Sequence, residues 1–228
     1  KEYSFLRHKN SPSLSIGFKP SKNFKKVKHK IPMLSLGNAF NEEDLNNFQK
    51  KILNFLSLNN SYEIEYSAEP KIDGISASLI YKNGKFIQGL SRGDGKEGED
   101  ITENLKTIKD IPKKIEATNF PEEIDIRGEV FIQNDDFKKI NDKFANPRNA
   151  ASGSLRQKNP KLTSKIPLKF IAYTYGYSKK LKINSQSDFL YNLNSWGFQI
   201  NQFNKIIKGV PNLISNHKKL EEKRKEIK

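Results

Sequence analysis

Apolar positions recur at two different spacings along the chain, and the change from one to the other predicts how the fold is built. Between residues 42 and 56 the spacing is helical. The repeating apolar residues are Leu45, Phe48, Ile52, Phe55 and Leu56. Asn41 precedes this run and acidic residues open it, as at a capped helix N-terminus. The pattern therefore predicts a helix.

From residue 62 the spacing becomes that of strands. Residues 62–66 and 75–81 predict two strands, and Asn83-Gly84 favours a tight hairpin turn into a return strand at 86–90. Further strands are predicted at 124–132 and 168–176, and helices at 100–109, 135–143, 187–196, the start of 149–157, and from 212 onward. Strands that come as hairpins with helices between them favour an α+β fold over a doubly wound parallel sheet.

Composition narrows the class of protein. The 228 residues are 35% hydrophobic and 29% charged, which is typical of a water-soluble globular protein. No apolar stretch reaches the length of a membrane helix, and the first residues do not resemble a secretory signal. The chain has no cysteine, which excludes disulfides and thiolate chemistry. We expect a cytoplasmic monomer without membrane contact.

The net charge of +15 is concentrated at the N-terminal end. Residues 1–30 hold nine Lys or Arg and one acidic residue, and show no sustained periodicity. Basic segments of this kind suit phosphate backbones, although a solvated lysine-rich surface is the alternative. Only six of the 41 basic residues are arginine, and four of these lie in residues 92–156. Arginine retained there indicates sites that need a planar, bidentate donor for phosphate or carboxylate.

Lys71 lies between two predicted strands in the segment Glu69-Pro70-Lys71-Ile72-Asp73-Gly74. A lysine acts as a nucleophile only when its amine is neutral, and its ordinary pKa is about 10.4. Desolvation or a neighbouring cation would lower that pKa. Glu69 and Asp73 flank Lys71 at two residues on each side and would share its face of an extended chain. A surface loop with a routine ion pair is the alternative.

Three other segments carry candidate chemistry. Residues 91–95, Ser-Arg-Gly-Asp-Gly, are glycine-rich enough to bring backbone close to a ligand, or they form a turn. Glu129 falls inside a predicted strand, where a carboxylate needs a partner such as a ribose hydroxyl, a metal ion or a base. Residues 144–157 are dense in small residues and include Arg148 and Arg156, which can each bind a phosphate.

The remaining histidines and aromatics are expected to play structural roles. We expect His8, His29 and His217 to lie on the surface, because their spacing does not suit a metal site. We expect the aromatic side chains of the C-terminal half to pack in the core. They are Phe170, Tyr173, Tyr175, Tyr177 and Trp196.

The order of these segments resembles that of covalent nucleotidyltransferases. Residues 71–74, 91–95 and 127–130 resemble the first three motifs of that group. Residues 32–36, 98–104 and 146–157 resemble bacterial NAD-dependent DNA ligases in particular. The resemblance covers roughly residues 11–200. It implies the adenylation (nucleotidyltransferase) fold of antiparallel sheets with flanking helices.

The resemblance also implies a reaction and its residues. Lys71 would take AMP from NAD⁺, AMP would pass to the 5′-phosphate of a nick in duplex DNA, and the 3′-hydroxyl would displace it, as DNA replication and repair require. Mg²⁺ would offset phosphate charge, with ligands that the sequence does not identify. By position, Asp73 would support the nucleophile. The remaining residues would contact the nucleotide (Ser35, Leu36, Glu69, Gly74, Arg92 and Glu129) or phosphates of the nick (Arg148 and Arg156).

The chain departs from the family at both ends. Residues 1–30 resemble a basic linker and the remnant of a subdomain that binds nicotinamide mononucleotide, and residues 31–228 resemble an adenylation domain incomplete at its C-terminus. The two later lysine motifs of the family have no match. We therefore expect weak or no nick sealing by these residues alone. An ATP-dependent or RNA-modifying nucleotidyltransferase, and a remnant that binds nucleotide or DNA without ligation, are the competing hypotheses.

Overall fold

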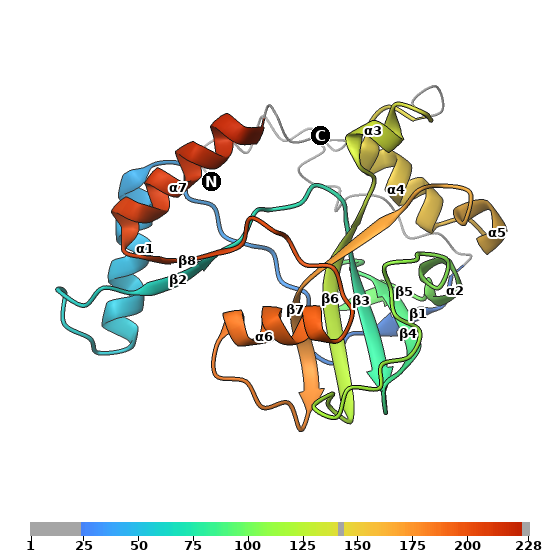
Figure 1. Cartoon of the computed structure of the whole chain (residues 1–228), viewed down its shortest axis with the longest axis horizontal. Coiled ribbons are helices and arrows are strands. Elements are labelled where there is room, and N and C mark those ends of the chain that lie inside the picture. Colours follow the sequence, from blue (N-terminus) through green and yellow to red (C-terminus); the bar gives the residue numbers. More distant parts are fainter. Residues whose placement is uncertain (1–23, 141–143, 225–228) are drawn as a thin grey trace, which may run out of the picture.

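A computed structural model describes residues 24–140 and 144–224. Its centre is a four-stranded antiparallel sheet in the order β4-β3-β6-β7 (Figure 1). The strands are β3 (Ile75–Lys82), β4 (Lys85–Ser91), β6 (Glu123–Phe131) and β7 (Lys169–Lys179). The expected α+β class and antiparallel pairing are confirmed.

The β3–β4 hairpin forms where the sequence predicts it. Asn83 and Gly84 both have positive φ angles, 48° and 73°, as a tight two-residue hairpin turn requires. A side chain at position 84 would also meet the Ile115 carbonyl oxygen at 2.1 Å. Backbone conformation and close approach therefore both favour glycine at this position.

Helices pack on one face of the central sheet and form the core with it. The longer helices are α4 (Pro147–Leu155) and α6 (Gln186–Ser195), while α2 (Thr102–Leu105), α3 (Asn134–Phe137) and α5 (Pro160–Thr163) are single turns. Leu105, Ala151, Leu155 and Phe189 are almost fully buried in this core. The aromatic cluster around Tyr81 continues it, with the Phe198 ring centroid 5.8 Å away.

A short two-stranded sheet joins the start of the described chain to the body. Here β1 (Lys26–Lys28) pairs antiparallel with β5 (Glu97–Glu99), with Val27 opposite Gly98. The sequence shows no periodicity at either strand, and neither is predicted. The expected division at residue 30 stays a prediction, and residues 1–23 of the expected linker lie outside the described part.

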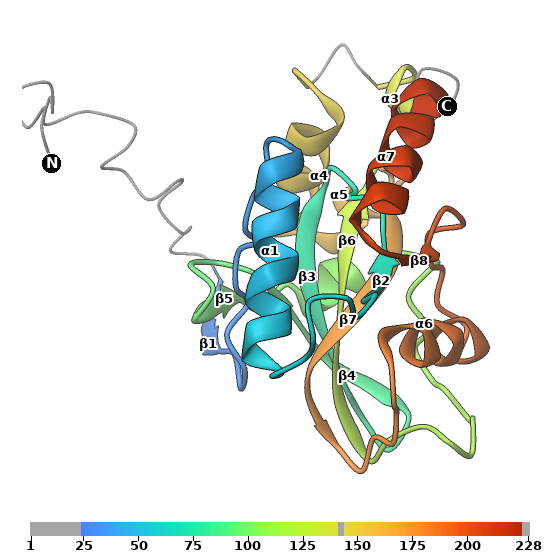
Figure 2. The same ribbon diagram turned by 90° about the vertical axis from the view of Figure 1, so that its left-hand side faces the viewer.

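The remaining elements form a second group beside the central sheet (Figure 2). These are α1 (Glu42–Phe55), β2 (Glu65–Ala68), β8 (Lys205–Lys208) and α7 (Val210–Arg224), in which β2 pairs with β8 and α1 contacts α7. Helix α1 and its cap are confirmed, since Asn41 Oδ1 accepts a hydrogen bond from Asp44 N at 2.9 Å. Leu53 is its buried residue, whereas Phe48 and Phe55 are exposed.

Several predicted bounds are wrong because tertiary pairing decides them. The strand predicted at 62–66 lies at 65–68, opposite β8, which was not predicted. The helix predicted at 100–109 ends after Leu105, where the chain turns to bury Ile108 and Ile111. The helix predicted at 135–143 is the single turn α3, and residues 141–143 lie outside the description.

The structure also bears on the histidines and the membrane. His29 was expected on the surface but is 9% exposed, because β1 carries it onto the sheet; His217 is exposed, and His8 lies outside the described residues. Within residues 24–140 and 144–224, no helix is both long and apolar enough to cross a membrane.

Candidate functional site

The candidate site begins with the alternation of β6, which separates two chemistries on the two faces of the sheet. Ile124, Ile126 and Val130 belong to the hydrophobic core. Asp125, Arg127 and Glu129 alternate with them and therefore face the opposite side, although all three are also buried. Ser76 and Ser78 of β3 lie opposite Glu129 and Arg127 and extend this polar row.

The segment with Lys71 enters this polar face between β2 and β3. Residues 69–73 form no regular strand, and the shared face expected for the side chains of residues 69, 71 and 73 stays a prediction. Lys71 is exposed, whereas Gly74 is buried against β6. A Cβ at Gly74 would lie 2.3 Å from the Val130 carbonyl oxygen and 2.9 Å from Glu129 Cγ. Glycine therefore lets the lysine loop approach Glu129 closely.

Glu129 is the buried carboxylate at the centre of the site. Its Oε2 atom accepts a hydrogen bond from Ser76 Oγ at 2.9 Å, and its side chain is only slightly exposed. Burial raises the pKa of Glu129 above its ordinary value. The Ser76 hydrogen bond and the positive charges of Lys71 and Arg148 oppose that increase in pKa. Lys71 and Arg148 therefore lie within electrostatic reach of this carboxylate.

Asp73 and Arg148 join the same cluster. Arg148 donates from its guanidinium group to Asp73 Oδ1 at 2.8 Å, across 75 positions of sequence. Helix α4, which carries Arg148 in its first turn, is capped by Asn146, whose Oδ1 accepts from Asn149 N at 2.8 Å. Both side chains of the ion pair are more than half exposed, so the pair is open to exchange with a competing anion.

Ser35 and Arg92, which are both predicted to contact the nucleotide, are hydrogen-bonded to each other. Arg92 donates to Ser35 Oγ at 2.7 Å and to the Met33 carbonyl oxygen at 3.3 Å. Arg127 likewise donates to the Pro32 and Ile31 carbonyl oxygens, at 3.0 and 2.5 Å. Two arginines thus hold residues 31–35 at the polar face. Leu36, also predicted as a nucleotide contact, is 74% exposed.

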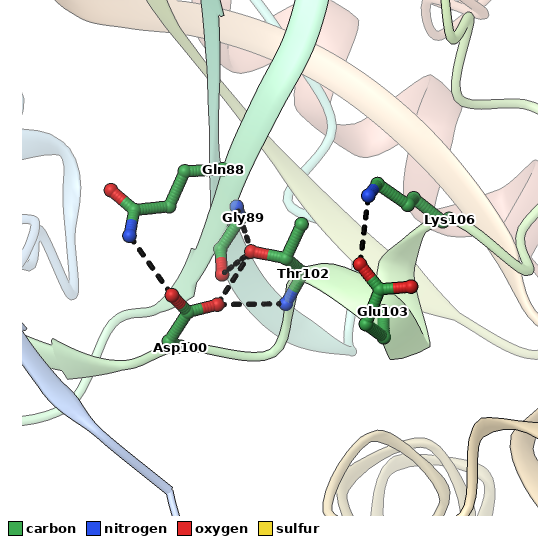
Figure 3. Close-up of polar contacts among 6 residues, drawn as sticks. All are labelled: Gln88, Gly89, Asp100, Thr102, Glu103 and Lys106. Atoms are coloured by element: carbon green, nitrogen blue, oxygen red, sulfur yellow. Dashed lines mark hydrogen bonds and ion pairs between the residues drawn. The ribbon is translucent and has the colours of Figure 1, made fainter.

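Arg156 lies at the end of α4 and donates to Glu99 Oε2 at 3.1 Å. The segment 98–104 holds this end of α4 in place, because Asn104 Nδ2 donates to the Gln157 carbonyl oxygen and to Thr163 Oγ1, both at 2.8 Å. Figure 3 shows that Asp100, in the same segment, accepts hydrogen bonds from Gln88 and Thr102. Thr102 Oγ1 in turn accepts from Gly89 N at 2.9 Å and joins this segment to β4.

Tyr173 of β7 connects the separate parts of the site. We expected it in the core, but it is half-buried, and Glu129, Arg127 and Arg92 lie within electrostatic reach of its hydroxyl. Burial raises the pKa of this hydroxyl. The Tyr173 carbonyl oxygen accepts from Gln186 Nε2 at 2.7 Å. Of the other aromatics expected in the core, Phe170 and Trp196 are fully buried there.

The predicted residues therefore converge only in part. Lys71, Asp73 and Arg148 all lie within electrostatic reach of Glu129. Arg92, which binds Ser35, lies within electrostatic reach of Tyr173, as Glu129 does. Sequence reasoning missed Ser76, Tyr173 and Gln186. Ser76 follows the Lys71 motif by two residues, and this spacing was the one available indication of its place.

The chemistry available here is a primary amine beside buried and exposed carboxylates, with several guanidinium groups. Such an arrangement suits a group-transfer reaction on an anionic substrate, because arginines bind phosphates bidentately. Across the described ranges 24–140 and 144–224, no three His, Asp or Glu side chains are grouped so as to hold a metal ion.

Known proteins match this chain along its length. The model of the family described as NAD-dependent DNA ligase adenylation domain matches residues 21–228. A protein named DNA ligase from Pelagibacter ubique (strain HTCC1062) is 74% identical over 100% of this chain and 34% of its own length. Proteins of the same name from Parvibaculum lavamentivorans and Bradyrhizobium sp. (strain ORS 278) are 45% and 43% identical, over 97% and 100% of the chain. The chain spans about a third of the length of these relatives.

Proposed function

Because the chain belongs to the family of NAD-dependent DNA ligase adenylation domains, we propose that its Lys71 carries AMP between NAD⁺ and a DNA nick. The observation that supports this proposal most directly is the set of charges at the Lys71 loop. An exposed lysine lies within electrostatic reach of the buried Glu129 carboxylate, with the Asp73–Arg148 pair beside it. The adenylation fold implied by the family is part of the same proposal.

In the first step the neutral amine of Lys71 attacks the α-phosphorus of NAD⁺. A P–N bond forms, the P–O bond to nicotinamide mononucleotide breaks, and the amine loses a proton. Glu129 lies within electrostatic reach of Lys71 and of Arg148, and Arg148 would add a cation beside the reacting phosphate. Ser35 and Arg92 would contact the ribose and phosphate, and Glu69 the adenine.

In the second step an oxygen of the nick 5′-phosphate attacks the same phosphorus, and the P–N bond breaks to regenerate Lys71. In the third, the 3′-hydroxyl attacks the activated 5′-phosphate, AMP leaves, and the strand is sealed. Arg148 and Arg156 are the proposed contacts for nick phosphates. Each is paired with a carboxylate, Asp73 or Glu99, so a phosphate would have to compete with that carboxylate.

The role proposed for Mg²⁺ is limited to compensating the negative charge of the phosphates. Bound to the phosphates, it would supply charge compensation. Because the described residues offer no group of three acidic or histidine side chains for it, we assign it no ligand from the chain. The role in replication and repair is also a proposal, as is nicked duplex DNA as the partner. The monomeric state and cytoplasmic location expected from the sequence stay predictions.

Intact mass spectrometry of the purified chain, before and after incubation with NAD⁺ and Mg²⁺, tests the proposal. We expect a gain of one adenylate that is absent from Lys71→Ala. Lys113→Ala is the matched control, because Lys113 is an exposed loop lysine whose loss should leave the gain unchanged. ATP in place of NAD⁺ should not support the gain, which separates this family from ATP-dependent enzymes.

Two outcomes would contradict the proposal. Adenylate gained equally by Lys71→Ala would move the nucleophile to another residue. No gain by the unchanged chain, together with measurable binding of AMP or DNA, would favour a binding module without chemistry. Measuring DNA binding at several salt concentrations completes that second test, since phosphate contacts weaken as salt rises.

A further inference from the structure

We propose that Gln186 is a positioning residue that orients the Glu69 carboxylate for recognition of the amino group on the purine ring. This inference rests on the proposed function, since it concerns how the adenylate end of NAD⁺ is selected. Gln186 is the first residue of α6, and Glu69 precedes Lys71 by two residues, so 117 positions separate them. The tertiary structure brings them into direct contact.

One amide nitrogen makes two contacts across the site. Gln186 Nε2 donates to Glu69 Oε1 at 2.9 Å and to the Tyr173 carbonyl oxygen at 2.7 Å. An amide nitrogen has two hydrogens, so both contacts are satisfied together. The amide therefore joins the lysine loop to β7 at Tyr173. Gln186 spans the two sides of the proposed nucleotide site.

Glu69 is held through only one of its two oxygens. Ser67 Oγ donates to the same Oε1 atom at 2.9 Å. In residues 24–140 and 144–224, no hydrogen bond to Glu69 Oε2 is found. Two donors on Oε1 fix the plane of the carboxylate and leave Oε2 available to a ligand. A carboxylate oxygen accepts hydrogen bonds, so it favours an amino group over a carbonyl oxygen.

The element that carries Gln186 is suited to fixing a side chain. Helix α6 lies beside β7 in Figure 1, and Phe189 and Leu193 of this helix are fully buried. The Phe189 ring centroid is 4.8 Å from that of Tyr175 on β7. Ser185 caps the helix, its Oγ accepting from Asp188 N at 3.1 Å. The Gln186 amide is therefore presented from an anchored helix end.

Calorimetric titration of the 228-residue chain with AMP and with IMP separates positioning from a merely structural role. IMP differs from AMP by a carbonyl oxygen in place of the amino group that Glu69 would recognise. We expect the unchanged chain to bind AMP at least about tenfold more tightly than IMP, because the carboxylate would face an acceptor in IMP. Gln186→Leu, which removes the donor and keeps similar bulk, should reduce this preference about fivefold.

Two further variants keep the test specific. Ser67→Ala removes the other donor to Oε1 and should also reduce the preference for AMP. Gln202→Leu is the matched control, because Gln202 is exposed and should leave the preference unchanged. Thermal unfolding of each variant checks that the fold persists.

The outcomes distinguish this inference from the proposed function. If Gln186→Leu keeps the full preference for AMP, or weakens AMP and IMP binding equally, Gln186 is a structural link and the inference is overturned. If the unchanged chain binds neither nucleotide at millimolar concentration, the proposed function fails, and the inference that rests on it fails too.

Discussion

The two faces of the central sheet are formed by the same strands and have opposite chemistry. On one face of β6, Ile126 is fully buried among aliphatic and aromatic side chains. On the other, Arg127 and Asp125 are buried as an ion pair with a nitrogen–oxygen distance of 3.0 Å. Burial of apolar surface is favourable at every position of the first face. On the second, burial is tolerable only because each charge has a partner.

This difference indicates which face carries the site. The apolar face is covered by the helices that pack on it. The polar face, in contrast, brings together ionisable groups whose protonation and partners can change. Glu129 illustrates this, because burial raises its pKa while neighbouring cations act in the opposite direction. Perturbed carboxyls beside cationic groups are frequent at functional sites. The same alternation of one strand thus supplies both the core and the candidate site.

The largest expected effect tests the polar face. Arg127→Met removes the cationic partner of the buried Asp125 carboxylate, which keeps its hydrogen bond from Ser78, and the donors to the Ile31 and Pro32 carbonyl oxygens. We expect a loss of about 4 kcal/mol in the free energy of unfolding, measured by urea denaturation. The double variant Asp125→Leu with Arg127→Met should recover most of this loss, because no charge is then buried alone. A double variant as unstable as the single one would show that the ion pair itself stabilises the face.

The next effect tests the apolar face. Ile126→Ala leaves a cavity at a fully buried position of β6 and should cost about 3 kcal/mol in the same measurement. Ile87→Ala on β4, an edge strand of the same sheet, is the control, since Ile87 is 48% exposed and its truncation should cost much less. Equal losses for the two variants would contradict the assignment of the core to this face.

A smaller effect distinguishes the two faces by pH. The raised pKa of Glu129 means that its stabilising contribution is complete below the ordinary value of 4.5 and is lost as pH rises through the raised pKa. Glu129→Gln should therefore gain stability relative to the unchanged chain as pH increases across that window. Ser76→Ala should move the window to higher pH, because the Ser76 hydrogen bond lowers the pKa of Glu129. Thermal unfolding followed from pH 4 to 8 measures both shifts, and a pH-independent difference would argue against the buried carboxylate.

The smallest expected effect lies at the exposed end of β6. Glu122 accepts from Lys179 at 2.6 Å and pairs with Lys180, and these contacts lower its pKa to about 2. Its contribution is present above 4.5 and lost as pH falls toward 2, the opposite direction from Glu129. Because Glu122 is solvated, Glu122→Gln should change the unfolding temperature only slightly, and 1 M salt should abolish the difference. A persistent difference at high salt would point to packing instead of charge.

Much of the local structure was predictable because its causes lie within a few residues. Asn83-Gly84 predicts its hairpin turn, and Asn41 predicts its helix cap, because backbone conformation and capping are local properties. The apolar face of α1 was predicted less well. Leu53 is buried while Phe55 is 88% exposed, since the neighbouring elements decide which side of a helix is covered.

Patterns in the sequence were enough to predict the central hairpin, the strand β6 and the order of the motifs around Lys71. That order identified the ligase family. Three other features become visible only in the folded chain: the pairing of β2 with β8, the Arg148–Asp73 ion pair, and the link from Glu69 through Gln186 to Tyr173. The two sets of features differ in how far apart the interacting residues are along the chain. Turns, caps and periodicity depend on neighbouring residues, whereas a hydrogen bond across 117 positions depends on how every intervening element packs.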